Sequence, residues 1–213
     1  MISTRMLGLF AIAAGALIVV PGPAVMYIVA RSVHQGRRAG LVSALGVAAG
    51  GLVHVAGAVL GFSALLASSV LAFSAVRWLG AAYLVYLGVK TLRGGDVAGA
   101  AAAPPPPAPP RRLFTQGFVV NVLNPKTALF FLAFLPQFVE PGRGRVPLQM
   151  LLLGGAFVLL AIVSDATYAL LAGTLGGRIA RTAGARRRAR ILSGSVYVAL
   201  GIGMVLAGSR GEG

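Results

Sequence analysis

Pro21-Gly22-Pro23 and Asn124-Pro125-Lys126 each interrupt a long hydrophobic stretch of this chain. Proline has no N–H to bond the preceding helical turn, and its ring crowds the carbonyl group of that turn. Lipid cannot satisfy the backbone groups that such a break exposes, so broken backbone persists at membrane depth only beside protein or a wet cavity. The two motifs therefore predict two broken membrane helices that border an internal cavity.

The composition predicts an all-α polytopic membrane protein. The 213 residues are 57% hydrophobic and 11% charged, with a mean hydropathy of +0.87, whereas about a quarter of the residues of a soluble domain are charged. Apolar runs near or above the ~20 residues of a membrane helix occur six times, without the alternation of a membrane strand. They are residues 7–30, 41–66, 70–90, 113–139, 148–172 and 191–208. We expect six transmembrane helices, of which the first and fourth are broken.

A proline-rich segment divides these runs into two sets of three. Residues 94–112 contain Gly94, Gly95, an alanine run and Pro104 to Pro107, a composition typical of a stiff, solvated linker. We expect a first half at 1–93, a cytoplasmic linker at 94–112 and a second half at 113–213. Because three is odd, the second half would enter the membrane from the opposite side, giving two inverted halves.

The net charge of +15 has a topological explanation. Most of the nineteen basic residues follow the first, third and fifth runs; they are Arg31, Arg37, Arg38, Lys90, Arg93, Arg111, Arg112, Arg178, Arg181, Arg186, Arg187, Arg188 and Arg190. Positive residues stay on the cytoplasmic side, so these loops are expected inside and both termini outside. This reading is favoured over recognition of nucleic acid or lipid head groups.

Two charged residues lie inside the runs and need a reason to be there. Asp165, the acid of the fifth run, should face the bundle interior because an isolated charge in hydrocarbon costs at least ~2.5 kcal/mol. We favour proton exchange as its role over a structural ion pair or a protonated carboxyl.

Lys126 would begin the half-helix after the break, where its amine and the helix dipole favour an anion such as a carboxylate. Alternatives are a lysine that snorkels to water or pairs permanently with Asp165.

Other polar groups near the breaks are weaker candidates. Asn121 and Asn124 share a helix face and can bond freed backbone or a ligand. At the first break, Gly22 permits close approach and Pro23 leaves carbonyl groups that suit a substrate ammonium, although a simple kink is the alternative. His54 can relay protons, but packing is the commoner role of a lone membrane histidine.

Aromatic and glycine residues add packing signals. Tyr83, Tyr86 and Tyr168 are candidates to line the cavity or only to pack. Gly46-x-x-x-Gly50 and Gly57-x-x-x-Gly61 place small residues on one helix face, which favours close helix packing within a subunit or between subunits of a homo-oligomer.

Together these motifs make the chain resemble the LysE/RhtB family of bacterial amino-acid exporters. The resemblance spans nearly the whole length and rests on Pro21-Gly22-Pro23, Gly36-Arg37-Arg38-Ala39-Gly40, Gly46-x-x-x-Gly50, Gly80-Ala81-Ala82-Tyr83-Leu84, Gly88, Phe114-x-x-Gly117, Asn121-x-x-Asn124-Pro125-Lys126, Pro136-Gln137-Phe138, Asp165 and Tyr168. It implies a six-helix exporter of the bacterial inner membrane that moves amino acids or close derivatives outward, driven by protons. The proline-rich linker is longer than the resemblance leads us to expect.

Rival functions have less support. An intramembrane serine enzyme using Ser195 and His54 lacks the expected motif around Ser193-Gly194-Ser195. Export of a metal ion would need more intramembrane carboxylates, histidines or thiols, and the chain has no cysteine. We therefore expect no catalytic residues, no cofactor and no metal site, with amino acids, protons and membrane lipid as the partners.

Overall fold

The computed structural model describes residues 2–68, 70–93 and 107–175, together with positions 191, 195, 196, 198, 199 and 202. This part of the chain is helical and contains no strand. Its elements are α1 (Thr4–Val19), α2 (Pro23–Gln35), α3 (Arg37–Ser68), α4 (Val70–Leu92), α5 (Pro110–Val122), α6 (Pro125–Leu129), a π-helical turn η1 (Phe130–Phe134), the 3₁₀ turns η2 (Leu135–Phe138) and η3 (Pro141–Arg143), and α7 (Val146–Leu175). Most of the linker 94–112 and of the run 191–208 lies outside the described residues, so the six-helix count stays a prediction.

Within the described residues, two helices are long and apolar enough to cross a membrane alone, Arg37–Gly61 of α3 and Val146–Thr174 of α7. Two pairs of consecutive helices could each cross the membrane as a single bent span. The pair Thr4–Val19 and Pro23–Gln35 bends by 49°, and the pair Pro110–Val122 and Pro125–Phe138 bends by 47°. The breaks therefore lie at the two proline motifs, as the sequence predicts. Leucine and valine side chains stay exposed on the outer faces of these helices, which suits contact with lipid.

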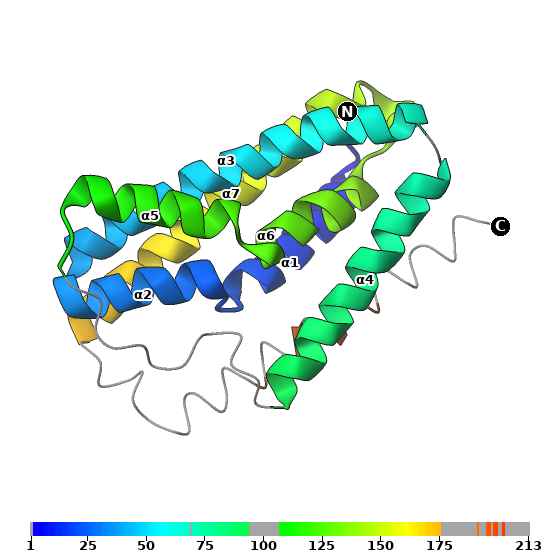
Figure 1. Ribbon diagram of the computed structural model, residues 1–213. Coiled ribbons are helices and arrows are strands. Elements are labelled where there is room, and N and C mark those ends of the chain that lie inside the picture. Colours follow the sequence, from blue (N-terminus) through cyan, green and yellow to red (C-terminus); the bar gives the residue numbers. More distant parts are fainter. Residues whose placement is uncertain are drawn as a thin grey trace.

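Helix α3 packs against α2, α5 and α7, and α2 also packs against α5 and α7. Helix α4 leaves the end of α3 and contacts η1 (Figure 1). Gly36 makes the sharp turn from α2 into α3, because its φ of +85° is accessible chiefly to glycine. The two breaks lie side by side near the middle of this bundle, where α1 passes into α2 and α5 passes into α6 (Figure 1).

Glycines let α3 and α5 approach closely. A Cβ atom on Gly50 would lie 2.6 Å from the Phe118 carbonyl oxygen, and one on Gly46 would overlap the Phe114 carbonyl group. On the facing helix, a Cβ atom on Gly117 would lie 2.5 Å from the Ser43 carbonyl oxygen. The first Gly-x-x-x-Gly motif therefore serves packing inside the subunit. In the second motif, a Cβ atom added to Gly57 or Gly61 would have no described neighbour within 4 Å.

One end of the bundle is held by a polar network around the buried Arg31. Its guanidinium donates to Gln116 on α5 at 2.8 Å and to Gln35 at 3.1 Å, and it lies over the Tyr27 ring. The Tyr27 hydroxyl donates to the Leu113 carbonyl at 2.9 Å. These bonds tie α2 to the start of α5.

The other end contains an aromatic cluster from α1, η1, η2 and α7. The Phe130 and Phe157 rings stack with centroids 4.2 Å apart, and the Phe10 and Phe138 rings meet edge to face at 5.5 Å. Phe131 and Phe134 complete this cluster. Buried aromatic pairs add about 0.5–1.5 kcal/mol each beyond the area that they bury.

Gly46→Ala should destabilise the protein by about 1–3 kcal/mol, because the new methyl group must displace the backbone of α5. Thermal unfolding of the purified protein in detergent measures the effect as a melting temperature lowered by several degrees. Gly57→Ala is the matched control and should leave the melting temperature unchanged or slightly higher, since alanine has the better helix propensity. Equal effects of the two variants would contradict the described packing.

Candidate functional site

The first break frees backbone carbonyl groups, and other helices supply their partners. In an unbroken helix the N–H of residue 23 would bond the Val19 carbonyl, but Pro23 has none. The Tyr168 hydroxyl of α7 donates to this carbonyl at 2.7 Å. The Val20 carbonyl lies in the break itself and accepts a hydrogen bond from Lys126 Nζ. Gly22 caps α2 without a side-chain bond.

At the second break the partners come both from another helix and from the break itself. Pro125 cannot bond the Asn121 carbonyl, which instead accepts from His54 Nε2 at 2.8 Å and from the Asn124 N–H at 3.0 Å. The Asn124 side chain caps α6 by accepting from the Lys126 N–H at 3.1 Å. The two breaks therefore differ in one respect: the start of α6 has a side-chain cap, and the start of α2 does not.

Asn121 connects the second break to α3. Its Nδ2 donates to the Val47 carbonyl at 2.7 Å, and its Oδ1 accepts from Thr127 Oγ1 at 2.9 Å and from Asn124 Nδ2 at 3.4 Å. Both groups of its side chain are therefore used inside the protein. This leaves Asn121 as a structural centre of the site.

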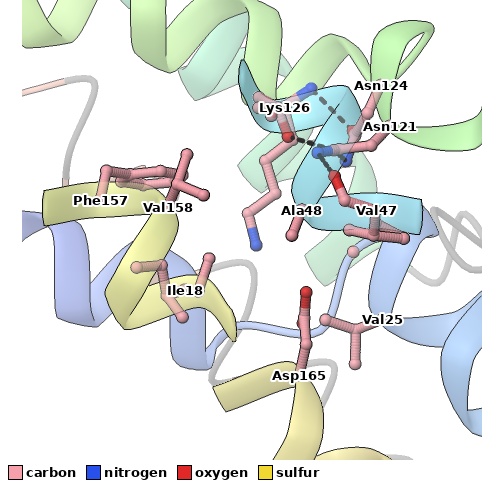
Figure 2. Close-up of a pocket in the computed structure, with 15 residues that line it drawn as sticks. Ile18, Val25, Val47, Ala48, Asn121, Asn124, Lys126, Phe157, Val158 and Asp165 are labelled. Carbon is pink, nitrogen blue, oxygen red and sulfur yellow. Dashed lines mark hydrogen bonds between the residues drawn. The ribbon is translucent and has the colours of Figure 1, made fainter. Parts of the chain in front are cut away.

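Lys126 and Asp165 face each other across a cavity between the breaks (Figure 2). Their side chains are buried, with 8% and 5% of their surface exposed. The Lys126 chain runs from α6 across to the first break, and Asp165 approaches from α7 beside Val25 (Figure 2). Two opposite charges buried in one cavity stabilise each other, since each alone would be strongly unfavourable there.

The cavity measures about 50 Å³ and has mostly apolar walls. That is room for a few water molecules, because one water needs about 10–15 Å³. Its lining comprises Ile18, Gly22, Ala24, Val25, Val47, Ala48, Gly51, Asn121, Asn124, Lys126, Thr127, Phe157, Val158, Ala161 and Asp165. The chemistry available is one cation, one carboxyl group and backbone or amide dipoles among hydrocarbon.

The residues predicted from the sequence fall into three groups. Gly22, Asn121, Asn124, Lys126 and Asp165 line the cavity. Pro21, Pro23 and Pro125 form the breaks beside it, and His54 and Tyr168 lie outside its lining. Tyr83 is not part of the lining either; it packs against the hydrophobic core, with its ring centroid 5.9 Å from that of Tyr86.

His54 is tied to packing by two contacts. Its Nε2 donates to the Asn121 carbonyl, and its ring stacks on Phe131 with centroids 6.0 Å apart. These contacts agree with the packing alternative that the sequence left open for this residue.

Sequence reasoning did not single out Thr127 or the apolar wall of the cavity. Thr127 follows Lys126 directly, so its position beside the break was the available signal. Ile18, Val25 and Val158 look like any other apolar residue of a membrane helix, and only the packing of α1, α2 and α7 identifies them as lining. No group of three or more histidine, cysteine, aspartate or glutamate residues that could hold a metal occurs among the described residues.

These features define a multi-pass helical membrane protein with a small charged cavity at the junction of two broken helices. Residues 15–209 match the profile of the LysE type translocators, and the chain belongs to this family. The family and the named relatives indicate a transporter rather than an enzyme.

Relatives extend the comparison. The chain is 35% identical over 196 residues to an uncharacterized membrane protein of Pseudomonas aeruginosa, covering 90% of this chain and 87% of the relative. It is 28% identical to the homoserine/homoserine lactone efflux protein of Salmonella typhimurium, covering 89% of this chain and 90% of the relative. It is 27% identical to the leucine efflux protein of the same organism, over 58% of each chain. No solved structure matches the chain.

Asn121→Leu should lower the free energy of unfolding by about 1–3 kcal/mol, because it removes the buried bonds of the Asn121 side chain to the Val47 carbonyl and to the Thr127 hydroxyl. A melting curve in detergent would show the loss. Thr115→Val on the exposed face of α5 removes only a bond to the Arg111 carbonyl and should be nearly neutral. If both variants melt like the wild type, Asn121 does not hold the second break.

Proposed function

We propose that this protein exports amino acids or close derivatives across the bacterial inner membrane, by proton antiport with alternating access. Family membership and the efflux relatives support export of small amino acids. The observation that supports a substrate site here is the cavity between the two breaks, where Lys126 and Asp165 face each other.

A zwitterion suits this cavity because both of its charges have a counterpart. The substrate carboxylate would lie towards Lys126, and the substrate ammonium towards the carbonyl groups of the first break and Asp165. The hydrocarbon of Ile18, Val25 and Val158 would receive an apolar side chain. Such a site resembles the midplane sites that other transporters build from broken helices.

Alternating access fits the small size of the cavity. Ligand pockets typically measure ~300–1,000 Å³, and the cavity of about 50 Å³ is too small to enclose an amino acid without helix movement. The breaks give the helices places to bend. We propose that the Arg31 network closes one side of the site and the aromatic cluster closes the other, and that they open in turn.

The remaining features of the proposal follow from the sequence. Loops rich in arginine would face the cytoplasm and both termini the outside. Residues 1–93 and 113–213 would form two inverted halves joined by the linker 94–112. A homo-oligomer is compatible with the exposed Gly57 and Gly61 positions.

Counterflow into proteoliposomes tests the substrate class. The vesicles are loaded with one unlabelled amino acid, beginning with leucine and homoserine, and uptake of the labelled compound is followed. We expect transient accumulation for at least one of them. Failure of every standard amino acid and of homoserine, with protein that melts cooperatively, would exclude amino-acid export.

Asp165→Asn should abolish transport that is driven by a pH gradient and affect counterflow exchange less, because the amide keeps the shape of the carboxyl group but cannot take up or release a proton. The measurement is labelled substrate movement in proteoliposomes with and without the gradient. Glu140→Gln is a matched neutralisation in the loop after η2 and should transport normally. Gradient-driven transport by Asp165→Asn at the wild-type rate would rule out this proton-coupling role.

A further inference from the structure

The side chain of Lys126 joins the two breaks. Its ammonium donates to the Val20 carbonyl of the first break, while its backbone belongs to the first turn of α6 after the second. The hydrocarbon part of the chain lies against Gly22, where an added Cβ atom would sit 3.0 Å from Lys126 Cδ. Because Gly22 has no side chain, it leaves space for the lysine side chain to cross to the first break.

The two neighbouring carbonyl groups of the first break have different partners. The Val19 carbonyl accepts from the hydroxyl of Tyr168, a neutral group on a short, stiff side chain. The Val20 carbonyl accepts from an ammonium on a flexible four-carbon side chain. A flexible ammonium can leave, whereas the Val20 carbonyl belongs to the backbone of the break and Asp165 is held on α7, facing the lysine across the cavity (Figure 2).

We propose that the Val20 carbonyl and Asp165 form a subsite for a primary ammonium group, which Lys126 fills in the protein without substrate and leaves when the ammonium of the substrate binds. This inference deepens the proposed function and rests on it for the identity of the second occupant. Lys126 is then a tethered stand-in for the substrate.

Charge balance supports the exchange. With Lys126 in the subsite, the buried carboxyl group of Asp165 faces a cation and the Val20 carbonyl freed by the break has a donor, so neither is buried without a partner. A bound zwitterion brings one positive and one negative charge. Its ammonium would replace that of Lys126, and its carboxylate would receive the displaced lysine, so the cavity keeps the same net charge.

Chemical rescue tests the subsite without any transport measurement. Lys126→Ala removes the tethered ammonium and leaves space that a small amine can enter. The variant should melt several degrees below the wild type, and ethylammonium chloride should restore part of the loss, because a ligand that binds the folded state stabilises it. Tetramethylammonium chloride has the same charge but no N–H to donate, and it should not restore stability.

The chain supplies its own control. Lys90 is the other of its two lysines, and it lies exposed on α4 with its ammonium over the Tyr86 ring. Lys90→Ala should show no difference between the two salts. An equal response of Lys126→Ala to both salts, or equal responses of the two alanine variants to ethylammonium, would overturn the subsite.

A second variant covers the case in which Lys126→Ala does not fold. The chain has no cysteine, so Lys126→Cys carries one thiol that can be converted to an aminoethyl disulfide, which rebuilds an ammonium, or to a neutral methyl disulfide. The aminoethyl form should melt higher than the methyl form. Equal melting of the two forms would again contradict the proposal.

The outcomes separate this inference from the proposed function. Rescue by a primary amine with no amino-acid counterflow would keep the ammonium subsite and exclude the proposed substrates. Counterflow without amine rescue would keep the transporter and exclude the role of Lys126 as a stand-in.

Discussion

The structure depends on one constraint, which is that backbone carbonyl groups freed inside an apolar bundle must find donors. Three prolines break two helices, and three side chains from elsewhere in the fold supply the donors: Tyr168 for Val19, Lys126 for Val20 and His54 for Asn121. Each of these bonds crosses from one helix to another. The breaks are therefore held at defined positions, and the cavity lies where they meet.

The regions on either side of the cavity differ in chemistry. Hydrogen bonds from Arg31 and Tyr27 tie α2 to α5 at one end, while stacked phenylalanine rings of α1, η1, η2 and α7 fill the other. Hydrogen bonds are directional and can exchange with water, whereas the aromatic cluster must move as packed rings. In the proposed cycle the Arg31 network and the aromatic cluster open at different times. The helices bend at the two breaks, while α3 and α7 remain continuous.

Part of this site was predictable from the sequence because proline and buried charge have strong local consequences. Both breaks occur at the predicted motifs, and Lys126 and Asp165 line the space between them. The partners of the freed carbonyl groups were harder to predict, since Tyr168 and His54 lie on helices far away in the chain. Helical spacing alone does not decide which face of α3 or α7 meets a break.

Two further residues show where pattern reasoning stops. Gly46 and Gly57 begin motifs of identical spacing, yet only the first lies against a described neighbouring backbone. Arg31 was counted among the charges that orient the chain in the membrane, but only 6% of it is exposed and its guanidinium is bonded inside the bundle. Gln35, four residues further along the helix, was the sequence signal for a local role.

The bond between Lys126 Nζ and the Val20 carbonyl can be measured directly by solid-state NMR. With ¹⁵Nζ-lysine and carbonyl-¹³C-valine labels, the chain's two lysines give two nitrogen signals, which a Lys90→Arg variant assigns. A hydrogen bond places the Lys126 nitrogen roughly 3.5–4 Å from the carbonyl carbon, so its signal should be strongly dephased by ¹³C. In Val20→Ile the carbonyl remains but is unlabelled, and dephasing should disappear. Dephasing of Lys126 no stronger than that of Lys90, or unchanged in Val20→Ile, would contradict the account.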